Sequence, residues 1–179
     1  MGELAEKLQK MTVNVTSPDR TVQLKVSRNV PMINVHPDIA VRHTESSLAR
    51  QLGFVMQGAW EGYQQGNSVA INETLGYTDT SIDESTGVDN PLMDQYDGER
   101  KRIRCTGVSQ EGWITLIRDV RGVHVTVERG AIDHFRNNRR ALITEINSVM
   151  HSALGDYSRK VRELYRQIFG SNMETIRGV

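Results

Sequence analysis

The chain has 179 residues, of which 37% are hydrophobic and 25% charged, a balance typical of a globular protein. No stretch approaches the ~18 consecutive apolar residues of a membrane helix, and the N-terminus lacks the basic region and apolar run of a signal peptide. Cys105 is the only cysteine, which excludes an internal disulfide and a zinc site built on several thiolates. We therefore expect a cytoplasmic protein that makes no membrane contact.

The formal net charge of zero conceals three blocks of different charge. Residues 1–66 carry +1, residues 67–99 carry −8 without a single basic residue, and residues 100–179 carry +7. Such blocks often mark interaction surfaces or solvated segments. We divide the chain into a first unit (1–67), an acidic connector (68–99), a basic second unit (100–170) and a C-terminal tail (171–179).

The first unit begins with a predicted helix over Glu3–Met11. Alternation of apolar and polar residues then predicts three antiparallel strands around residues 13–15, 22–26 and 33–35, with turn-prone stretches at 17–20 and 28–29. A helix follows, whose apolar stripe is Leu48, Leu52, Val55, Ala59 and Tyr63. Its glycines Gly58, Gly62 and Gly66 suggest close approach by another backbone, such as the equivalent helix; the alternative is a weak, frayed helix.

The second unit shows the same order. Cys105 falls where Val13 falls, so we interpret it as a small buried apolar residue. Strands are predicted at residues 114–116 and 123–127. The apolar stripe of the following helix is Leu142, Ile146, Val149, Ala153 and Tyr157. This helix continues beyond the stripe to a stop at Gly170, which makes it longer than thirty residues, and residues 91–99 are the only candidate for a leading helix.

The two units align residue by residue. Val22 falls on Ile114 and Val35 on Val127 at an offset of 92, whereas Leu48 falls on Leu142 at an offset of 94. The change of offset lies between strand and helix, where loops absorb insertions. We predict an α+β fold of two copies of a helix–meander–helix unit packed as a pseudo-two-fold dimer, in one six-stranded sheet or two abutting meanders. The alternative is that two amphipathic segments resemble each other because both need Val, Leu and Ala.

The first unit resembles the YbaB/EbfC family in the order of its elements and in three motifs. These are the S-x-x-x-x-V-x-L strand pattern from Ser17 to Leu24, the I-x-V that follows it, and a helix with A-x-x-x-Y (Ala59–Tyr63). The resemblance covers residues 3–66 and 101–169. It implies a small nucleoid-associated DNA-binding protein, here with the family dimer fused into one chain. Divergent relatives of this kind stand beside type VII secretion genes in actinobacteria. The two copies, the acidic connector and the unequal charge depart from simpler members.

The basic residues of the second unit are the candidate nucleic-acid contacts, because phosphates are bound by accessible cations without sequence readout. They form three clusters, which are Lys101, Arg102 and Arg104; Arg139 and Arg140; and Arg159, Arg162 and Arg166. The alternative is a solvated helix face with intrahelical pairs such as Arg159–Glu163. The acidic connector is interpreted as a solvated linker or, alternatively, as a DNA mimic that covers the basic half.

No catalytic motif, phosphate-binding loop or metal-binding histidine spacing occurs, so we expect no enzyme activity, cofactor or metal. Trp60 and Trp113 could stack on bases, although packing is the commoner role of tryptophan. The leading hypothesis is a DNA-binding, nucleoid-associated protein. The alternative is a protein-binding adaptor or chaperone, accessory to a type VII secretion system. Further homodimerisation of the fused pair remains open.

Overall fold

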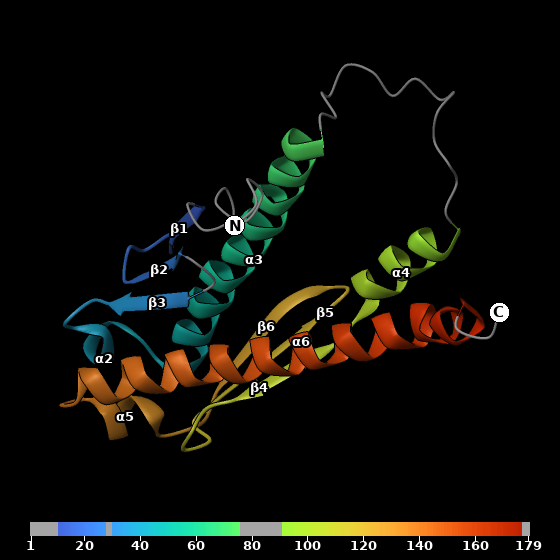
Figure 1. The fold of residues 1–179 in the computed structure, drawn as a ribbon. Helices are drawn as coiled ribbons and strands as arrows, with labels where there is room; N and C mark the ends of the chain where they lie inside the picture. The colour runs from blue at the N-terminus through green and yellow to red at the C-terminus, as the bar shows by residue number, and fades with distance from the viewer. Residues whose placement is uncertain (1–10, 28–29, 76–90, 177–179) are drawn as a thin grey trace.

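The computed structural model describes residues 11–27, 30–75 and 91–176, and Figure 1 shows the fold. The leading helix predicted over Glu3–Met11 lies outside the described residues except for Met11, and so do residues 76–90 of the acidic connector. Residues 68–75 and 91–99 of that connector belong to helices α3 and α4. The fold is α+β, with two three-stranded antiparallel sheets, as predicted.

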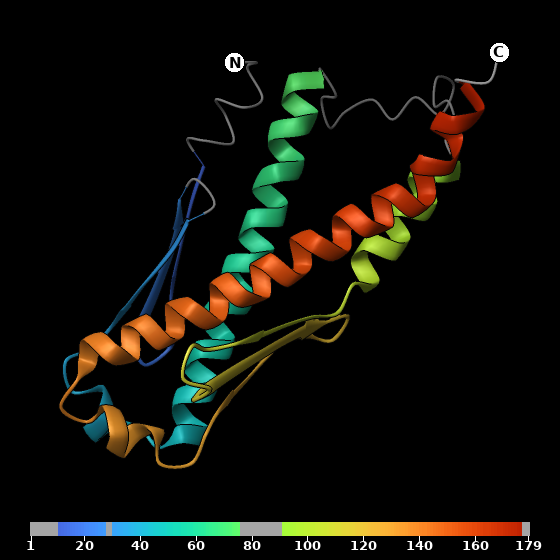
Figure 2. The ribbon, with the colours of Figure 1, turned by 60° about the horizontal axis from the view of Figure 1, so that its bottom comes forward.

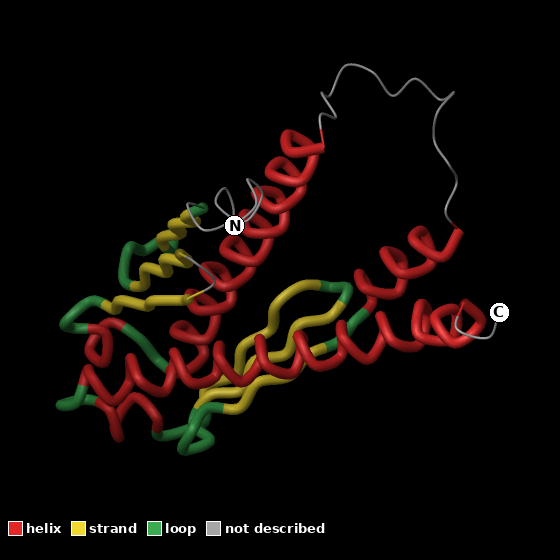
Figure 3. Tube along the Cα trace, viewed as in Figure 1, coloured by secondary structure: helices red, strands yellow, loops and turns green. Residues whose placement is uncertain are grey.

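The first sheet consists of β1 (Thr12–Thr16), β2 (Val22–Ser27) and β3 (Val30–Val35), and the second of β4 (Cys105–Val108), β5 (Ile114–Asp119) and β6 (Gly122–Val127). The two sheets are separate and do not form one six-stranded sheet (Figure 3). Their registers repeat at the offset of 92. Val22 faces Val35 in the first sheet, and Ile114 faces Val127 in the second.

Each sheet is followed by a short helix and a long one. Helices α2 (Ile39–Arg42) and α3 (Glu45–Leu75) follow the first sheet, α4 (Pro91–Arg102) precedes the second, and α5 (Ala131–Phe135) and α6 (Arg139–Ile176) follow it. The Thr44 hydroxyl accepts from the Ser47 amide and the Ser47 hydroxyl from the Thr44 amide, which caps α3 reciprocally. Helix α6 continues through Gly170, the predicted stop, because one glycine costs only about 1 kcal/mol in a helix interior.

Both long helices contact both sheets. Helix α3 packs on β1 and β2 of its own sheet and on β6 of the other, and α6 packs on β4 and β5 and on β3 (Figures 1 and 2). The predicted apolar stripes form the centre of one common core, in which the buried residues are Leu48, Leu52, Val55, Ala59, Leu142, Ile146, Val149 and Ala153. The buried residues that the structure describes therefore form one core shared by the two halves, as expected for units too small to fold alone.

The prediction that the equivalent helix approaches the helix glycines was wrong. A Cβ on Gly58 would lie 3.1 Å from Cγ1 of Val15, and one on Gly62 2.9 Å from Cγ1 of Val13. The close neighbour is thus strand β1, not the equivalent helix. In the second half the glycine is on the strand instead, where a Cβ on Gly107 would lie 2.3 Å from the carbonyl oxygen of Val149.

Candidate nucleic-acid interface

Helix α4 and the C-terminal part of α6 form one helical arm, which we define as residues 91–104 and 156–170. The two helices lie side by side in both views (Figures 1 and 2). The ring of Tyr96 packs edge-on against Tyr165 at 5.9 Å and at a tilt against Phe169 at 5.7 Å. Lys160 Nζ donates to the carbonyl oxygen of Arg104 at 2.8 Å. This packing joins two of the three predicted basic clusters.

Several cations of the arm are already paired with carboxylates. Arg159 donates to Asp156 at 2.6 Å and to Glu163 at 3.0 Å, and Lys160 donates to Asp156 at 2.8 Å. The hydrogen bond from Lys160, followed by those from the Thr106 amide and Arg159, outweighs burial and holds the pKa of Asp156 at about 2. The carboxylate is therefore charged at any working pH, and these two cations are partly neutralised.

Cations on α4 are also paired with carboxylates. Arg102 contacts Glu99 at 3.0 Å and Arg100 contacts Asp97 at 3.5 Å, both one turn apart on α4. Exposed pairs of this kind are weak and exchange readily with solvent. The intrahelical pairs that the sequence offered as an alternative to phosphate contacts are thus present for Arg102 and Arg159.

Four cations of the arm have no acidic partner among the described residues: Lys101, Arg104, Arg162 and Arg166. All four side chains are exposed. Arg162 and Arg166 flank a hollow of about 300 Å³ that is also lined by Tyr96, Val161 and Tyr165. Tyr165, which is 51% exposed, lines the same hollow as these two arginines.

The third predicted cluster lies at the opposite end of α6. Arg139 is a bridge between the halves, because its Nε donates to the Val35 carbonyl oxygen at 2.8 Å and its Nη2 to Asn34 Oδ1 at 2.6 Å. Arg140 is exposed. At 1.5 Å of rise per residue, Arg140 lies about 40 Å from Arg166 along the helix. The structure therefore does not bring this cluster to the arm.

Neither tryptophan presents a stacking surface of its own. Trp60 packs edge-on against Tyr157 at 4.8 Å, and the guanidinium of Arg118 lies 4.5 Å from the centre of the Trp60 ring. Trp113 stacks on His134 at 4.8 Å. The exposed aromatic ring of the arm is Tyr165, which the sequence analysis missed. Its signal was an aromatic residue placed between Arg162 and Arg166.

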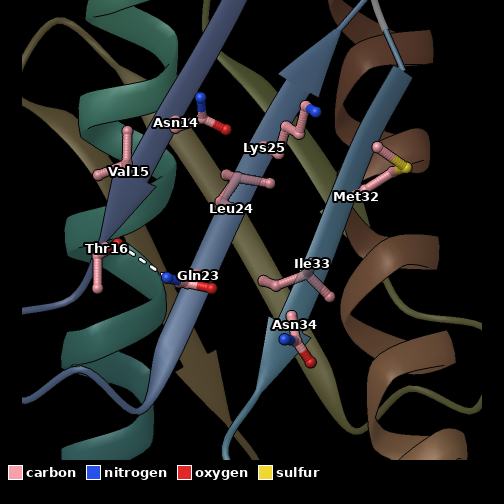
Figure 4. Close-up of a pocket in the computed structure, with 9 residues that line it drawn as sticks. All are labelled: Asn14, Val15, Thr16, Gln23, Leu24, Lys25, Met32, Ile33 and Asn34. Carbon is pink, nitrogen blue, oxygen red and sulfur yellow. Dashed lines mark hydrogen bonds between the residues drawn. The ribbon is translucent and has the colours of Figure 1, made fainter.

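The outer face of the first sheet carries a second hollow, of about 370 Å³ (Figure 4). Asn14, Lys25 and Met32 lie on this face, and the Gln23 side chain donates to Thr16 Oγ1 at 3.4 Å. In the described part of the chain, no group of three His, Cys, Asp or Glu side chains could hold a metal ion. Within the same residues, no helix has the length and hydropathy needed to cross a bilayer.

Comparison with known proteins gives no further assignment: no family model, no curated protein and no solved structure matches the chain.

Proposed function

We propose that this chain binds DNA through the phosphate backbone, as a cytoplasmic, nucleoid-associated protein, and that the helical arm makes the contacts. The observation that carries the proposal is the set of four exposed cations without an acidic partner in the described residues, two of which line the same hollow as the exposed Tyr165. Cations of this kind bind phosphates without reading sequence. The resemblance to the YbaB/EbfC family leads to the same expectation.

Four phosphate contacts make the proposed binding weak and salt-dependent. Each neutralised phosphate contributes about 0.9 to the slope of log affinity against log salt, so four give a slope near −3.6. Raising the salt from roughly 50 to 200 mM then weakens binding about 100-fold. The acidic side chains of the arm, five against eight basic ones, reduce the affinity further.

The test is a fluorescence-anisotropy titration of random duplex DNA at several salt concentrations. Replacing Arg162 and Arg166 with glutamine is expected to reduce the salt slope by about 2. The matched control replaces Arg121 and Arg129, two exposed arginines outside the arm, and removes the same charge. Absence of binding by the wild-type chain at low salt, or an equal loss in both double variants, contradicts the proposal.

A protein-binding adaptor is the second candidate, favoured by the apolar lining of the same hollow. Tyr96, Val161 and Tyr165 lie between two helices, an arrangement that suits the apolar face of a partner helix. Replacing Tyr165 with serine would then weaken capture of that partner, whereas DNA binding would depend mainly on the arginines. A specific partner lost by Tyr165→Ser, together with no DNA binding, would favour the adaptor.

We also propose that the two halves are diverged copies of one unit packed about a pseudo-two-fold axis. The repeated register and the reciprocal contacts of α3 with β6 and of α6 with β3 support this interpretation. Under it, the arm exists only in the second copy, so the DNA-binding surface is one-sided.

A further inference from the structure

The outward edge of β4 is covered by side chains of α6. The amide of Thr106 donates to Asp156 Oδ2 at 3.0 Å, and the amide of Val108 donates to Ser152 Oγ at 3.3 Å. Two residues past the strand, the Gln110 amide donates to Ser148 Oγ at 2.9 Å. A strand edge whose amides are bonded in this way cannot pair with another strand.

Two other edges are obstructed as well. On β6, the Val123 amide donates to Gln57 Oε1 at 2.7 Å. On β3, Pro31 has no amide hydrogen, and Arg139 occupies the Val35 carbonyl oxygen at 2.8 Å. Proline and bound side chains are the usual protections of an edge strand.

Among residues 11–27, 30–75 and 91–176, nothing protects the edge of β1 in this way. Because the Ser17 amide donates inward to Val22 at 2.8 Å, the alternation of an antiparallel pair directs the amides of Asn14 and Thr16 outward. Among the described residues, no side chain accepts from either amide, and both residues are exposed. The strand contains no charged residue and no proline.

The reason lies in α3. The residues of α3 that align at the offset of 94 with the α6 residues Ser148, Ser152 and Asp156 are Phe54, Gly58 and Gly62. None of the three offers a side-chain acceptor. Phe54 is 52% exposed and lies one turn before Gly58, whose Cβ position faces Val15 of β1. The open edge is therefore flanked by an exposed aromatic ring.

The sequence of β1 is a palindrome, Thr12-Val13-Asn14-Val15-Thr16. We propose that a second copy of this chain pairs with β1 in antiparallel register about a two-fold axis at Asn14. Thr12 then lies opposite the second copy's Thr16, Val13 opposite its Val15, and Asn14 opposite its Asn14. Asn14 exchanges two backbone hydrogen bonds with its equivalent, and the two pairs of threonines exchange four more.

The same register keeps like faces together. Val13 and Val15 are on the α3 side of the sheet in both copies, so the pairing extends the apolar face without exposing it. Each α3 lies against both β1 and β2. With strands about 4.8 Å apart, the two α3 helices come to about 10 Å, a normal helix-packing distance. Phe54 of each copy then lies near the interface.

The experiment measures the mass of the full chain by sedimentation over a range of concentrations. The wild-type chain is expected to dimerise. Asn14→Glu and Asn14→Lys each place like charges opposite one another, so each alone should be monomeric, and an equal mixture of the two should recover a heterodimer. Gln23→Glu, on the adjacent strand, makes the same charge change away from the edge and should dimerise like the wild type.

Urea unfolding is the control that tests whether the Asn14 variants fold. Hydrogen exchange measures directly whether the amides of β1 are protected. The amides of Asn14 and Thr16 should exchange more slowly as the concentration of the wild-type chain rises, because the proposed hydrogen bonds protect them. A wild-type chain that stays monomeric, a dimer that persists in both Asn14 variants, or a mixture that remains monomeric overturns the proposal. None of these outcomes depends on DNA binding by the arm.

Discussion

Ser17 and Ser109 lie 92 residues apart and make the same two hydrogen bonds in the first hairpin of their sheets. The Ser17 amide donates to the Val22 carbonyl at 2.8 Å, and its hydroxyl oxygen accepts from the Val22 amide at 3.0 Å. Ser109 does the same with Ile114, at 2.9 Å in both directions. Both serines are buried, so each hydroxyl satisfies an amide that water does not reach.

Ser109→Ala should destabilise the protein, because the Ile114 amide loses the hydroxyl oxygen that accepts its hydrogen bond in a buried site. We expect a loss of about 1–3 kcal/mol in the free energy of unfolding, measured by urea denaturation. Ser17→Ala should cost more, since the Ser17 hydroxyl also donates to Asp19 at 2.7 Å. Ser158→Ala, on an exposed face of α6, is the control. Equal stability of Ser109→Ala and the control would show that the hydroxyl is dispensable.

His43 should make the protein less stable as the pH falls below about 6.5. Burial lowers the pKa of His43 from its usual 6.5, and Arg42 lowers it further, although Asp19 acts in the opposite direction. The unfolded chain therefore takes up a proton before the folded one does. The contribution of His43 is fully present above pH 6.5 and decreases as the pH falls through the folded pKa.

The comparison is the urea midpoint at pH 7.5 and 5.5 for the wild type and for His43→Gln. The variant should lose the hydrogen bonds to Thr21 and Ser47, at 2.8 and 2.9 Å, and be less stable at both pH values. Its difference between the two pH values should be smaller than that of the wild type. His151→Gln, at an exposed site, should retain the wild-type difference. An unchanged difference in His43→Gln would rule out this histidine as the source.

Gly107→Ala should be among the most damaging single changes. Its Cβ would lie 2.3 Å from the Val149 carbonyl oxygen and 2.7 Å from the Ala153 amide nitrogen, and backbone atoms cannot move aside cheaply. We expect a loss of about 3 kcal/mol or more in the free energy of unfolding, as for overpacked cores. Gly155→Ala, with nothing within 4 Å of its Cβ, should stabilise helix α6 by about 1 kcal/mol. In urea denaturation, Gly107→Ala should lower the free energy of unfolding and Gly155→Ala should raise it.

The sequence predicted the elements that periodicity encodes. The strands around Val22 and Ile114 and the buried stripes from Leu48 and Leu142 follow from repeats of two and of three to four residues, which define faces without reference to the rest of the fold. The partner of Gly58 could not be predicted this way. Which element approaches a glycine depends on how β1 crosses α3, and Val13 and Val15 fill the space there.

The candidate site was only partly predictable for the same reason. Arg139 and Arg140 are neighbouring arginines that the sequence does not distinguish. Successive residues are rotated by about 100° around the helix, however, so Arg139 contacts β3 whereas Arg140 is exposed to solvent. The pairing of Arg159 with Glu163 was visible at a spacing of four. The joining of the 101–104 and 159–166 clusters was not, because it depends on α4 packing against α6 through Tyr96.

Arg139→Ala should reduce stability without changing the salt dependence of the proposed DNA binding. The substitution removes the bonds to the Val35 carbonyl and to Asn34, which connect α6 to the first sheet. We expect a loss of about 1.5–3 kcal/mol in the free energy of unfolding, since a hydrogen bond from a charged donor contributes this much. Arg140→Ala, an exposed neighbour, is the matched control for stability. A lower salt slope for Arg139→Ala would instead place Arg139 in the proposed DNA interface.

Cys105 should react with a thiol reagent only after unfolding. Cys105 is 1% exposed, and burial raises the pKa of its thiol. The nearby Arg118 guanidinium lowers this pKa, but it offsets the effect of burial only in part. The nucleophile in such reactions is the thiolate, so a buried thiol with a raised pKa is doubly protected. We expect the rate of labelling by an aromatic disulfide at pH 8 to follow the unfolded fraction as urea increases. Rapid labelling of the folded protein would mean that β4 separates from α6 in the native state, and the hydrogen bonds from Thr106 and Val108 would then be transient.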